Sequence, residues 1–466
     1  MPFTVLNQYY PVRNVLFVIG EGVMIYASVL FADWIVLGAK PFVIDEWLVL
    51  KIFLVTFVYQ TCLYYNDLYD LNTTYSFSEM GVRLLQALGI ATIFLAGIYF
   101  IFPHTIIGGG FFFAVTLVFL MLFIIFWRFC CTLILKRGLF NRKIIILGSG
   151  ELARNIMNEI NSRKNCGYIV ASIALESHGD TDFIKEKNMA VFCKEHHEGL
   201  CEVTKNLGIR KVVVALRDRR AGFPTKELLE CRISGTDVIE GDSFYEMLTG
   251  KLSVKHLNPE WLIFSSGFRK SFISCFMKRV TDIVLSSVML VALLPVIIIT
   301  AILIKVDSKG PALFSQERVG EKRKIYSIHK FRSMITDAEK ETGPKWAGED
   351  DPRITRVGHF IRKWRVDEIP QLWNVLKGEM SFVGPRPERE FFVKRLEYII
   401  PYYGARFTAK PGITGWAQVC YGYGASVKDA TEKLNYDLFY IKNMSIAMDM
   451  VIVLRTVKTV ISGIGR

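Results

Sequence analysis

Four long apolar stretches dominate the first third of the chain and predict membrane-spanning helices. They run from Val15 to Leu37, Trp47 to Tyr65, Leu84 to Phe102 and Phe111 to Leu135. Each is close to the roughly 20 residues that a helix needs to cross a bilayer, and short polar segments separate them. Residues 1–140 are therefore predicted to form a four-helix transmembrane region.

Charges in and around these stretches predict their packing and orientation. Glu21 and Arg128 lie inside the first and fourth stretches, where a charge is expected to face the interior of the bundle. Basic residues follow the fourth stretch at 136–143, which by the positive-inside rule places the rest of the chain in the cytoplasm. The first stretch has no clear cleavage site, and we interpret it as an anchor.

The pattern changes after residue 141 to that of an α/β domain, predicted to end near residue 250. The buried-strand run from Lys143 to Leu147 leads into Gly148-Ser149-Gly150 and a helical segment, which is a Rossmann-like opening. Only half of the dinucleotide fingerprint is present, with Glu176 as a candidate ribose contact. A regulatory or dimerising domain, which would make the chain a homodimer, is the preferred interpretation, and bound NAD is the alternative.

After a connector at 251–275, the apolar run from Ile283 to Ile304 has two interpretations. It is long enough to cross the membrane as an ordinary helix. However, Pro295 interrupts it and basic residues flank both sides, so crossing would move the rest of the chain out of the cytoplasm. A re-entrant helix at about 280–305 that breaks at Pro295 avoids both problems.

Composition and charge support this layout. Of the 466 residues, 51% are hydrophobic, which is too many for an ordinary soluble protein. The formal charge is +13, and residues 276–466 hold 30 Lys and Arg against 20 Asp and Glu, or +10 of it. A basic surface beside a membrane favours anionic lipid or phosphorylated substrates, and no nucleic-acid motif is present. Nine cysteines without a CxxC pair suggest neither a disulfide framework nor a cysteine metal site.

The most informative motif is the acid pair Asp367-Glu368, which precedes Pro370. Proline is tolerated in the first turn of a helix, so the acids are expected at or just before a helix N-cap. There the helix dipole favours an ionised aspartate, the form that a covalent mechanism needs as its nucleophile. Two adjacent carboxylates also suit a Mg²⁺ ion. An ordinary helix cap is the alternative.

A second motif, Gly384-Pro385-Arg386-Pro387, holds an arginine between two prolines. Proline fixes its own φ and restricts the preceding residue, so Arg386 sits on a stiff backbone that suits bidentate binding of phosphate. The alternative is a proline-rich turn with a solvated arginine. Carboxylate and phosphate chemistry are thus both predicted near the same place.

Several ordered motifs of the last 190 or so residues together resemble one family. They are Lys278-Arg279, Pro295, Lys330-Phe331-Arg332, Asp367-Glu368-Ile369-Pro370-Gln371, Gly384-Pro385-Arg386-Pro387 and Pro411-Gly412-Ile413-Thr414-Gly415. This set resembles the bacterial sugar transferases, the polyprenyl-phosphate hexose-1-phosphate transferases. The upstream spans and α/β domain are similar to the large exopolysaccharide-initiating branch, including its undecaprenyl-phosphate glucose phosphotransferases.

The resemblance implies a bacterial inner-membrane enzyme whose catalytic domain, residues 276–466, faces the cytoplasm. This domain would be mixed, mainly helical and monotopic. Such an enzyme moves a hexose-1-phosphate, here expected to be glucose-1-phosphate, from a UDP-sugar to undecaprenyl phosphate and releases UMP. The partners would be these two substrates and membrane lipid, with Mg²⁺ as cofactor.

By the same resemblance, Asp367 would be the nucleophile that forms a phosphosugar-aspartyl intermediate, and Glu368 would assist it; both would contact the metal. Arg386 and Arg362 would hold phosphate oxygens. Lys278, Arg279 and the break at Pro295 would sit where the polyprenyl phosphate meets the headgroups. Many members carry an arginine-bearing turn after the Pro-Gly-Ile-Thr-Gly motif, which this chain lacks, so the identity of the sugar stays open.

Two other functions fit parts of the sequence. A membrane-anchored, NAD-dependent nucleotide-sugar dehydratase or epimerase would need a tyrosine four residues before a lysine, and Tyr326 and Lys330 supply that spacing. A non-enzymatic membrane scaffold or sensor would use the Rossmann-like domain to bind a nucleotide. The scaffold predicts no special sensitivity at Asp367.

Overall fold

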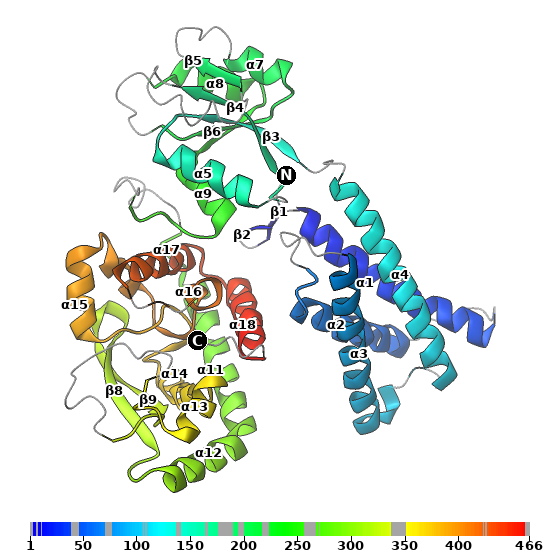
Figure 1. Cartoon of the computed structure of the whole chain (residues 1–466), viewed down its shortest axis with the longest axis vertical. Helices are drawn as coiled ribbons and strands as arrows, with labels where there is room; N and C mark the ends of the chain where they lie inside the picture. Colours follow the sequence, from blue (N-terminus) through cyan, green and yellow to red (C-terminus); the bar gives the residue numbers. More distant parts are fainter. Residues whose placement is uncertain are drawn as a thin grey trace. The chain divides into compact units, whose positions relative to one another are not determined.

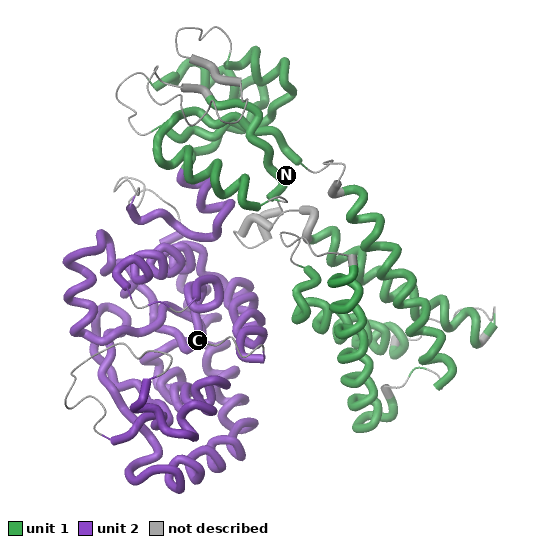
Figure 2. Tube along the Cα trace, in the orientation of Figure 1, with its two compact units in different colours: residues 1–5, 9–241 green, residues 6–8, 242–466 purple. Residues whose placement is uncertain are grey.

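The structure of the protein is a computed structural model. The structure describes residues 3–5, 8–10, 12–38, 46–69, 77–105, 107, 110–136, 141–163, 166–175, 190–193, 200–216, 223–255, 267–268, 270–336, 351–422, 424 and 426–461. The chain divides into two compact units (Figure 2). The first comprises Met1–Val5 and Tyr9–Gly241, and the second Leu6–Gln8 and Asp242–Arg466.

The chain begins with a short β1–β2 pair, Phe3–Val5 and Gln8–Tyr10, and four long apolar helices of the first unit follow (Figure 1). These are α1 (Val12–Leu37), α2 (Glu46–Tyr65), α3 (Phe77–Ile101) and α4 (Gly110–Lys136), with a 3₁₀ turn, η1 (Pro103–Thr105), before α4. All four are long and apolar enough to cross a membrane, which confirms the prediction, although the third span begins at Ser78 and not at Leu84.

The buried charges of this bundle pair with each other. Arg128 Nη2 lies 2.7 Å from Glu21 Oε1, and both side chains are almost fully buried. Arg128 Nη1 also donates to the Leu68 carbonyl. The expectation that these charges face the bundle interior is confirmed.

The α/β part of the first unit is a five-stranded parallel sheet with the order β5-β4-β3-β6-β7. Its elements are β3 (Arg142–Leu147), α5 (Glu151–Ser162), β4 (Tyr168–Leu175), β5 (Ala190–Cys193), α7 (Leu200–Asn206), β6 (Lys211–Val214), α8 (Thr225–Ile233) and β7 (Asp237–Glu240). Gly148 after β3 has φ +124°, and a Cβ there would lie 2.5 Å from the Ala215 carbonyl oxygen, so the turn requires glycine. Glu176, the candidate ribose contact, lies outside the described residues.

The boundary between the units differs from the expected domain end near 250. Helix α9 (Gly241–Thr249) lies almost wholly in the second unit, where Glu246 accepts hydrogen bonds from Lys442 and Asn443. Leu252 and Val254, from the segment expected to be a connector, are buried in the main core of the same unit.

The second unit is mainly helical, with two small two-stranded sheets. The antiparallel sheet pairs β8 (Leu313–Val319) with β9 (Ile325–Phe331), and the parallel one pairs β10 (Ser381–Val383) with β11 (Gly412–Thr414). The remaining elements are α11 (Phe272–Ala292), α12 (Leu294–Asp307), η3 (Glu321–Arg323), α13 (Arg356–Lys363), η4 (Val366–Glu368), α14 (Gln371–Lys377), α15 (Glu390–Ile399), η5 (Tyr403–Thr408), α16 (Trp416–Cys420), α17 (Val427–Asn443) and α18 (Ile446–Ile461).

Helices α11 and α12 form one apolar element that bends by 61° (Figure 1). The break lies at Leu293, and Pro295 stands in the first turn of α12, where its missing N–H leaves no helical hydrogen bond unmade. Large apolar side chains are exposed along both arms, with Val291 at 76% and Val306 at 81%. The bent shape agrees with the predicted break, and by length and composition the pair suits either a broken span or a re-entrant loop.

Candidate active site

The acid pair lies in a 3₁₀ turn of its own, η4, and not inside the following helix. Pro370 is the N-cap of α14, so the acids precede the cap by two and three residues, close to the expected position. The turn follows a reversal at Arg365, which has a left-handed backbone with φ +52°. Val366 and Ile369, on either side of the pair, pack against α12 in a small core that also includes Ile304.

Three cations surround the buried Glu368. Lys330 Nζ lies 2.8 Å and Arg386 Nη1 3.3 Å from Glu368 Oε1, while Arg365 Nη1 lies 3.5 Å from Oε2. Burial alone would raise the pKa of Glu368, but Lys330, Arg386 and Arg365 hold it well below its usual value. Glu368 is therefore ionised at any physiological pH and ties a strand and two turns together.

Asp367 has the opposite environment. No hydrogen bond or ion pair joins its carboxylate to any described residue, and burial together with the charge of Glu368 raises its pKa to about 6. The expectation that the helix N-terminus would favour ionised Asp367 is wrong in direction. The group nevertheless ionises below pH 7, so near neutral pH it is mostly a carboxylate without a partner.

The backbone around Arg386 is held at several points. Gly384 N donates to the Thr414 carbonyl at 2.9 Å, and Gly412 N donates to the Pro385 carbonyl at 3.0 Å. The Arg386 carbonyl in turn accepts a hydrogen bond of 2.8 Å from the buried Arg406. The stiff presentation of Arg386 expected from its two prolines thus has support from β11 and η5.

Arg406 is itself fixed by a buried carboxylate. Its Nη2 lies 2.9 Å from Asp437 Oδ2, and its Nη1 donates to the hydroxyl of Tyr403. Burial raises the pKa of Asp437 to about 6, against the opposing effect of Arg406. A substitution of Arg406 would therefore remove a support of the backbone at Arg386, although Arg406 itself does not contact the acid pair.

Arg362, at the end of α13, has a guanidinium with unused hydrogen-bonding capacity. Its Nη1 is buried and no group in the described part of the chain accepts its hydrogens. Its charge lowers the pKa of Asp367, so the two side chains are near neighbours. This position is compatible with the phosphate-binding role implied for Arg362.

Lys278 and Arg279 are engaged inside the protein. Lys278 Nζ lies 2.6 Å from Asp449 Oδ2 and 3.1 Å from the Val383 carbonyl. Arg279 donates to the carbonyls of Val375 and Leu376 at 2.6 and 2.7 Å and so caps the C-terminal end of α14. Both side chains thus bind groups inside the protein and fix α11 in place, which differs from the expected contact with polyprenyl phosphate.

The acid pair can be tested against the implied Mg²⁺. The described residues contain no group of three or more His, Cys, Asp or Glu side chains placed to hold a metal. Mg²⁺, however, commonly takes one or two carboxylates and completes its shell with water and substrate phosphates. The unpaired oxygens of Asp367 fit that arrangement, and Glu368 Oε2, whose contact with Arg365 is long, can join it.

Three residues near the acids had no role in the transferase site assigned from the sequence. Lys330 was singled out only within a motif of the resemblance and in the Tyr–Lys spacing of the alternative enzyme, and nothing in the sequence distinguishes Arg365 from its basic neighbours. Asn374 is fully buried; its side chain accepts a hydrogen bond from His329 N and donates to the Ser327 carbonyl, which fixes α14 to β9. In the sequence, its signal was an asparagine placed among the apolar residues of a short predicted helix.

The Tyr-x-x-x-Lys spacing expected for a dehydratase or epimerase falls on a strand. Tyr326 and Lys330 both belong to β9, where four residues span about 13 Å, whereas a helix would bring them together. Lys330 is also paired with Glu368. The geometry does not support a Tyr–Lys catalytic pair.

Comparison with known proteins gives two family matches. The model of a family described as bacterial sugar transferase matches residues 273–463, which contain the acid pair and every cation that contacts it. A second family, described as a CoA-binding domain, matches residues 65–221, which include strands β3 to β6 of the parallel sheet. The second match agrees with the α/β fold expected for this region.

Individual relatives agree with the first match. The chain is 41% identical over 255 residues to a UDP-N-acetylgalactosamine-undecaprenyl-phosphate N-acetylgalactosaminephosphotransferase of Aeromonas hydrophila, covering 54% of this chain and 59% of the relative. It is 32% identical over 324 residues to an undecaprenyl-phosphate glucose phosphotransferase of Komagataeibacter xylinus, covering 68% and 58%. An exopolysaccharide production protein of Rhizobium leguminosarum bv. phaseoli is 42% identical over 186 residues, with 93% of its length covered and 39% of this chain. The alignments thus span less than two thirds of the first two relatives.

Proposed function

The chain belongs to the bacterial sugar transferase family, and from this we propose that it transfers a sugar-1-phosphate from a UDP-sugar to undecaprenyl phosphate and so initiates synthesis of an exopolysaccharide. One observation carries the proposal. Of two adjacent carboxylates, Glu368 is neutralised by three cations and Asp367 has no partner among the described residues. Such an arrangement leaves one carboxylate available as a nucleophile beside cations that can bind phosphate.

The proposed reaction has two steps. In the first, an Oδ atom of Asp367 bonds to the β-phosphorus while the bond from that phosphorus to the bridging oxygen breaks, and UMP leaves with the electron pair. In the second, a phosphate oxygen of undecaprenyl phosphate attacks the same phosphorus, and the bond to Asp367 breaks. The carboxylate is regenerated, and the product is an undecaprenyl diphosphate sugar.

The side chains around Asp367 support both steps. Arg386 and Arg362 present guanidinium groups to the phosphate oxygens, and the buried Glu368 keeps Arg386 and Lys330 in place. Mg²⁺ held by the acid pair would supply further positive charge to the diphosphate.

Contacts from the middle of α11 and from the end of α12 support a re-entrant element. Asp282 in α11 accepts hydrogen bonds from Ser381 Oγ and Phe382 N, and Asp307 at the end of α12 accepts one from Val357 N. Both arms therefore reach the same folded unit, whereas a crossing would separate their ends by about 30 Å of hydrocarbon. We propose that the pair enters the cytoplasmic leaflet of the bacterial inner membrane and returns.

Exposed aromatic side chains near the acid pair support placement of the site at headgroup level. Phe360, Trp364 and Trp373 are exposed, and Lys363 and Lys377 lie about 6 Å from the two tryptophan rings. Aromatic rings flanked by lysine are typical of the membrane–water interface. The nucleophile would then meet both a water-soluble donor and a lipid-linked acceptor.

The first test is UMP release from UDP-sugars and undecaprenyl phosphate by the full chain in detergent. Asp367→Asn should abolish release while the protein remains folded, and substantial retained activity would exclude the covalent role. A panel of UDP-glucose, UDP-galactose and UDP-N-acetylgalactosamine identifies the sugar, for which glucose is our expectation. No UMP release with any donor would refute the proposed transfer.

The topology has a separate test. Lys309→Cys, placed in a chain whose other cysteines except Cys275 are replaced, gives one label on each side of the bend. A membrane-impermeant maleimide should reach both positions from the cytoplasmic face only. Labelling of the two positions from opposite faces would show that the element spans the membrane.

A further inference from the structure

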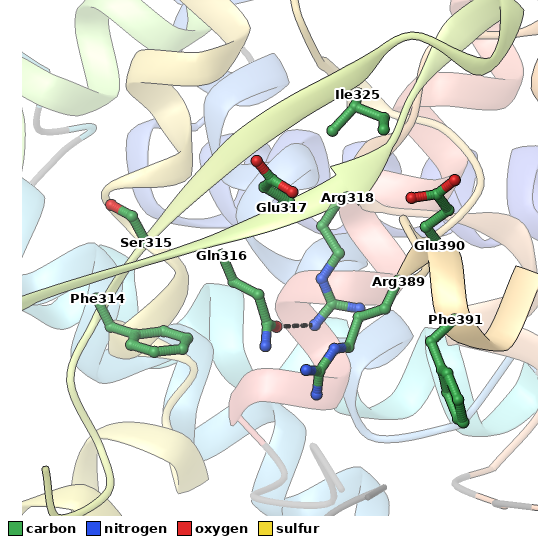
Figure 3. Close-up of a pocket in the computed structure, with 9 residues that line it drawn as sticks. All are labelled: Phe314, Ser315, Gln316, Glu317, Arg318, Ile325, Arg389, Glu390 and Phe391. Atoms are coloured by element: carbon green, nitrogen blue, oxygen red, sulfur yellow. Dashed lines mark hydrogen bonds between the residues drawn. The ribbon is translucent and has the colours of Figure 1, made fainter. Parts of the chain in front are cut away.

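A cavity of about 400 Å³ lies between strand β8 and the start of α15, within the second unit (Figure 3). Phe314, Gln316 and Arg318 project into it from one side of the strand, and Arg389 and Phe391 approach from α15 (Figure 3). Its volume falls within the range of small-ligand sites, and nothing described so far uses it.

The strand register places this cavity on the same face of the hairpin as the acid pair. Phe314 is paired with Lys330, and Gln316 and Arg318 are paired with Ile328 and Tyr326. Directly opposite residues of an antiparallel pair project to the same face. Lys330 is one of the three cations that contact Glu368, and Phe314 is the immediate cross-strand neighbour of Lys330.

The other side of the cavity also leads to the acid pair. Arg318 Nη1 donates to the carbonyl of Pro387 at 3.2 Å, and its guanidinium lies 3.8 Å from Glu388. Pro387 directly follows Arg386, the second cation on Glu368. The cavity is therefore bordered by the two segments that carry Lys330 and Arg386, two of the three cations on Glu368.

The orientation of the Gln316 amide is fixed by its partner. Arg318 Nη2 lies 2.7 Å from Gln316 Oε1, and a guanidinium can only donate hydrogen bonds, so the carbonyl oxygen must face it. The amide nitrogen then points away from Arg318 into the cavity (Figure 3). The Gln316 amide nitrogen thus offers a hydrogen-bond donor to a ligand, because no acceptor for it is found in the described part of the chain.

Aromatic and charged groups make up most of the lining, which includes the carboxylates of Glu317 and Glu390 as well as two arginines. Phe314 and Phe391 are 46% and 58% exposed, which leaves ring surface available to a flat ligand. Arg318 Nε is buried without an acceptor among the described residues. Two aromatic rings, one amide donor and arginine side chains match a nucleotide: a planar base with a carbonyl edge, joined to a phosphate.

We propose that this cavity binds the uridine nucleotide of the donor, with uracil against Phe314 and its C4 carbonyl accepting from Gln316. The proposal rests on the UDP-sugar donor of the proposed function and adds where the leaving nucleotide is held. Cytosine carries an amino group at C4, which would face the Gln316 donor with another donor. The cavity therefore selects uracil over cytosine.

Direct binding tests this without turnover. The full chain carrying Asp367→Asn, purified in detergent, is titrated with UMP and CMP by calorimetry. Adding Phe314→Ala should weaken UMP binding by about five- to tenfold or more, the usual effect of losing one base-stacking ring, and Phe314→Trp should retain it. Gln316→Ala should remove the preference for UMP over CMP. Ser327→Ala, on the opposite face of the hairpin, is the matched control and should change neither.

Several results would overturn the assignment. One is equal UMP affinity in the parent and Phe314→Ala proteins at an unchanged unfolding midpoint; another is no UMP binding by the parent at millimolar concentration. In an otherwise active chain, Phe314→Ala should raise the KM for the UDP-sugar, and a rise for undecaprenyl phosphate instead would assign the cavity to the acceptor. If UMP binds in a Phe314-dependent way but no sugar phosphate is transferred, the proposed function fails and the nucleotide site stands.

Discussion

Neutralising the proposed nucleophile should make the protein more stable while it abolishes activity. Asp367 is half-buried beside the charge of Glu368 and has no hydrogen-bond partner among the described residues. Burial and Glu368 raise its pKa from 3.8 to about 6. The folded protein thus holds this carboxylate against its electrostatic preference, and Asp367→Asn removes the conflict.

The size and sign of the effect follow from linkage between protonation and folding. An acid whose pKa is raised by folding ionises first in the unfolded chain, so stability falls as the pH rises from about 4 to 6 and stays low above. A shift of about two pKa units is worth about 3 kcal/mol, and we expect about 2 kcal/mol after allowance for the partial solvent contact of Asp367. For a unit of this size, Asp367→Asn should raise the unfolding midpoint by about 4–8 °C at pH 7.5.

The assay is thermal unfolding of the full chain in detergent at pH 7.5 and at pH 4.5, followed by tryptophan fluorescence. The gain should be largest at pH 7.5 and small at pH 4.5, where Asp367 is already protonated in the folded state. Glu368→Gln is the matched control, since it makes the same change in charge one residue away but should destabilise, because it leaves three cations without their shared carboxylate. A loss of stability in Asp367→Asn at pH 7.5, or an equal gain at both pH values, would refute this reasoning.

Three further outcomes are expected. The kcat/KM for the UDP-sugar should fall as the pH drops through about 6, because Asp367 becomes protonated, and the inflection should move to lower pH in Glu368→Gln if residual activity allows a profile. Lys330→Met should reduce kcat/KM for the UDP-sugar by at least about tenfold without loss of fold, because Glu368 loses the ion pair at its Oε1. Unchanged kinetics would contradict a role for this pair. Asp282→Ala should lower the unfolding midpoint, as it leaves Ser381 Oγ and Phe382 N without an acceptor, and an unchanged midpoint would show that this anchor of α11 is unimportant.

Much of this architecture could be predicted from local patterns in the sequence. The four membrane helices follow from the length of their apolar stretches, and the parallel sheet follows from a strand that ends in a glycine turn. The place of the acid pair followed from Pro370, which fixes where a helix can begin. Each of these signals lies within a few residues of the structure that it predicts.

Long-range partners could not be predicted in this way. Lys278 stands before an apolar run, where a lysine at the headgroups and a lysine paired inside the protein look alike; its partner Asp449 is 171 residues away. The same holds for Arg279, which caps α14 about 96 residues further along the chain. The pKa of Asp367 depends on burial and on Glu368 more than on the helix dipole, and burial is set by the distant α12 and β9.

Glu368 explains how a reactive carboxylate can be kept free at this site. A lone buried acid among Lys330, Arg365 and Arg386 would pair with them, and Asp367 would be such an acid if its neighbour were apolar. Because Glu368 pairs with these cations, they stay ordered beside Asp367 without binding it, and the charges of Lys330 and Arg386 still oppose the rise of its pKa. The two adjacent acids therefore have different roles: Glu368 organises the cations, and Asp367 remains available to attack phosphorus.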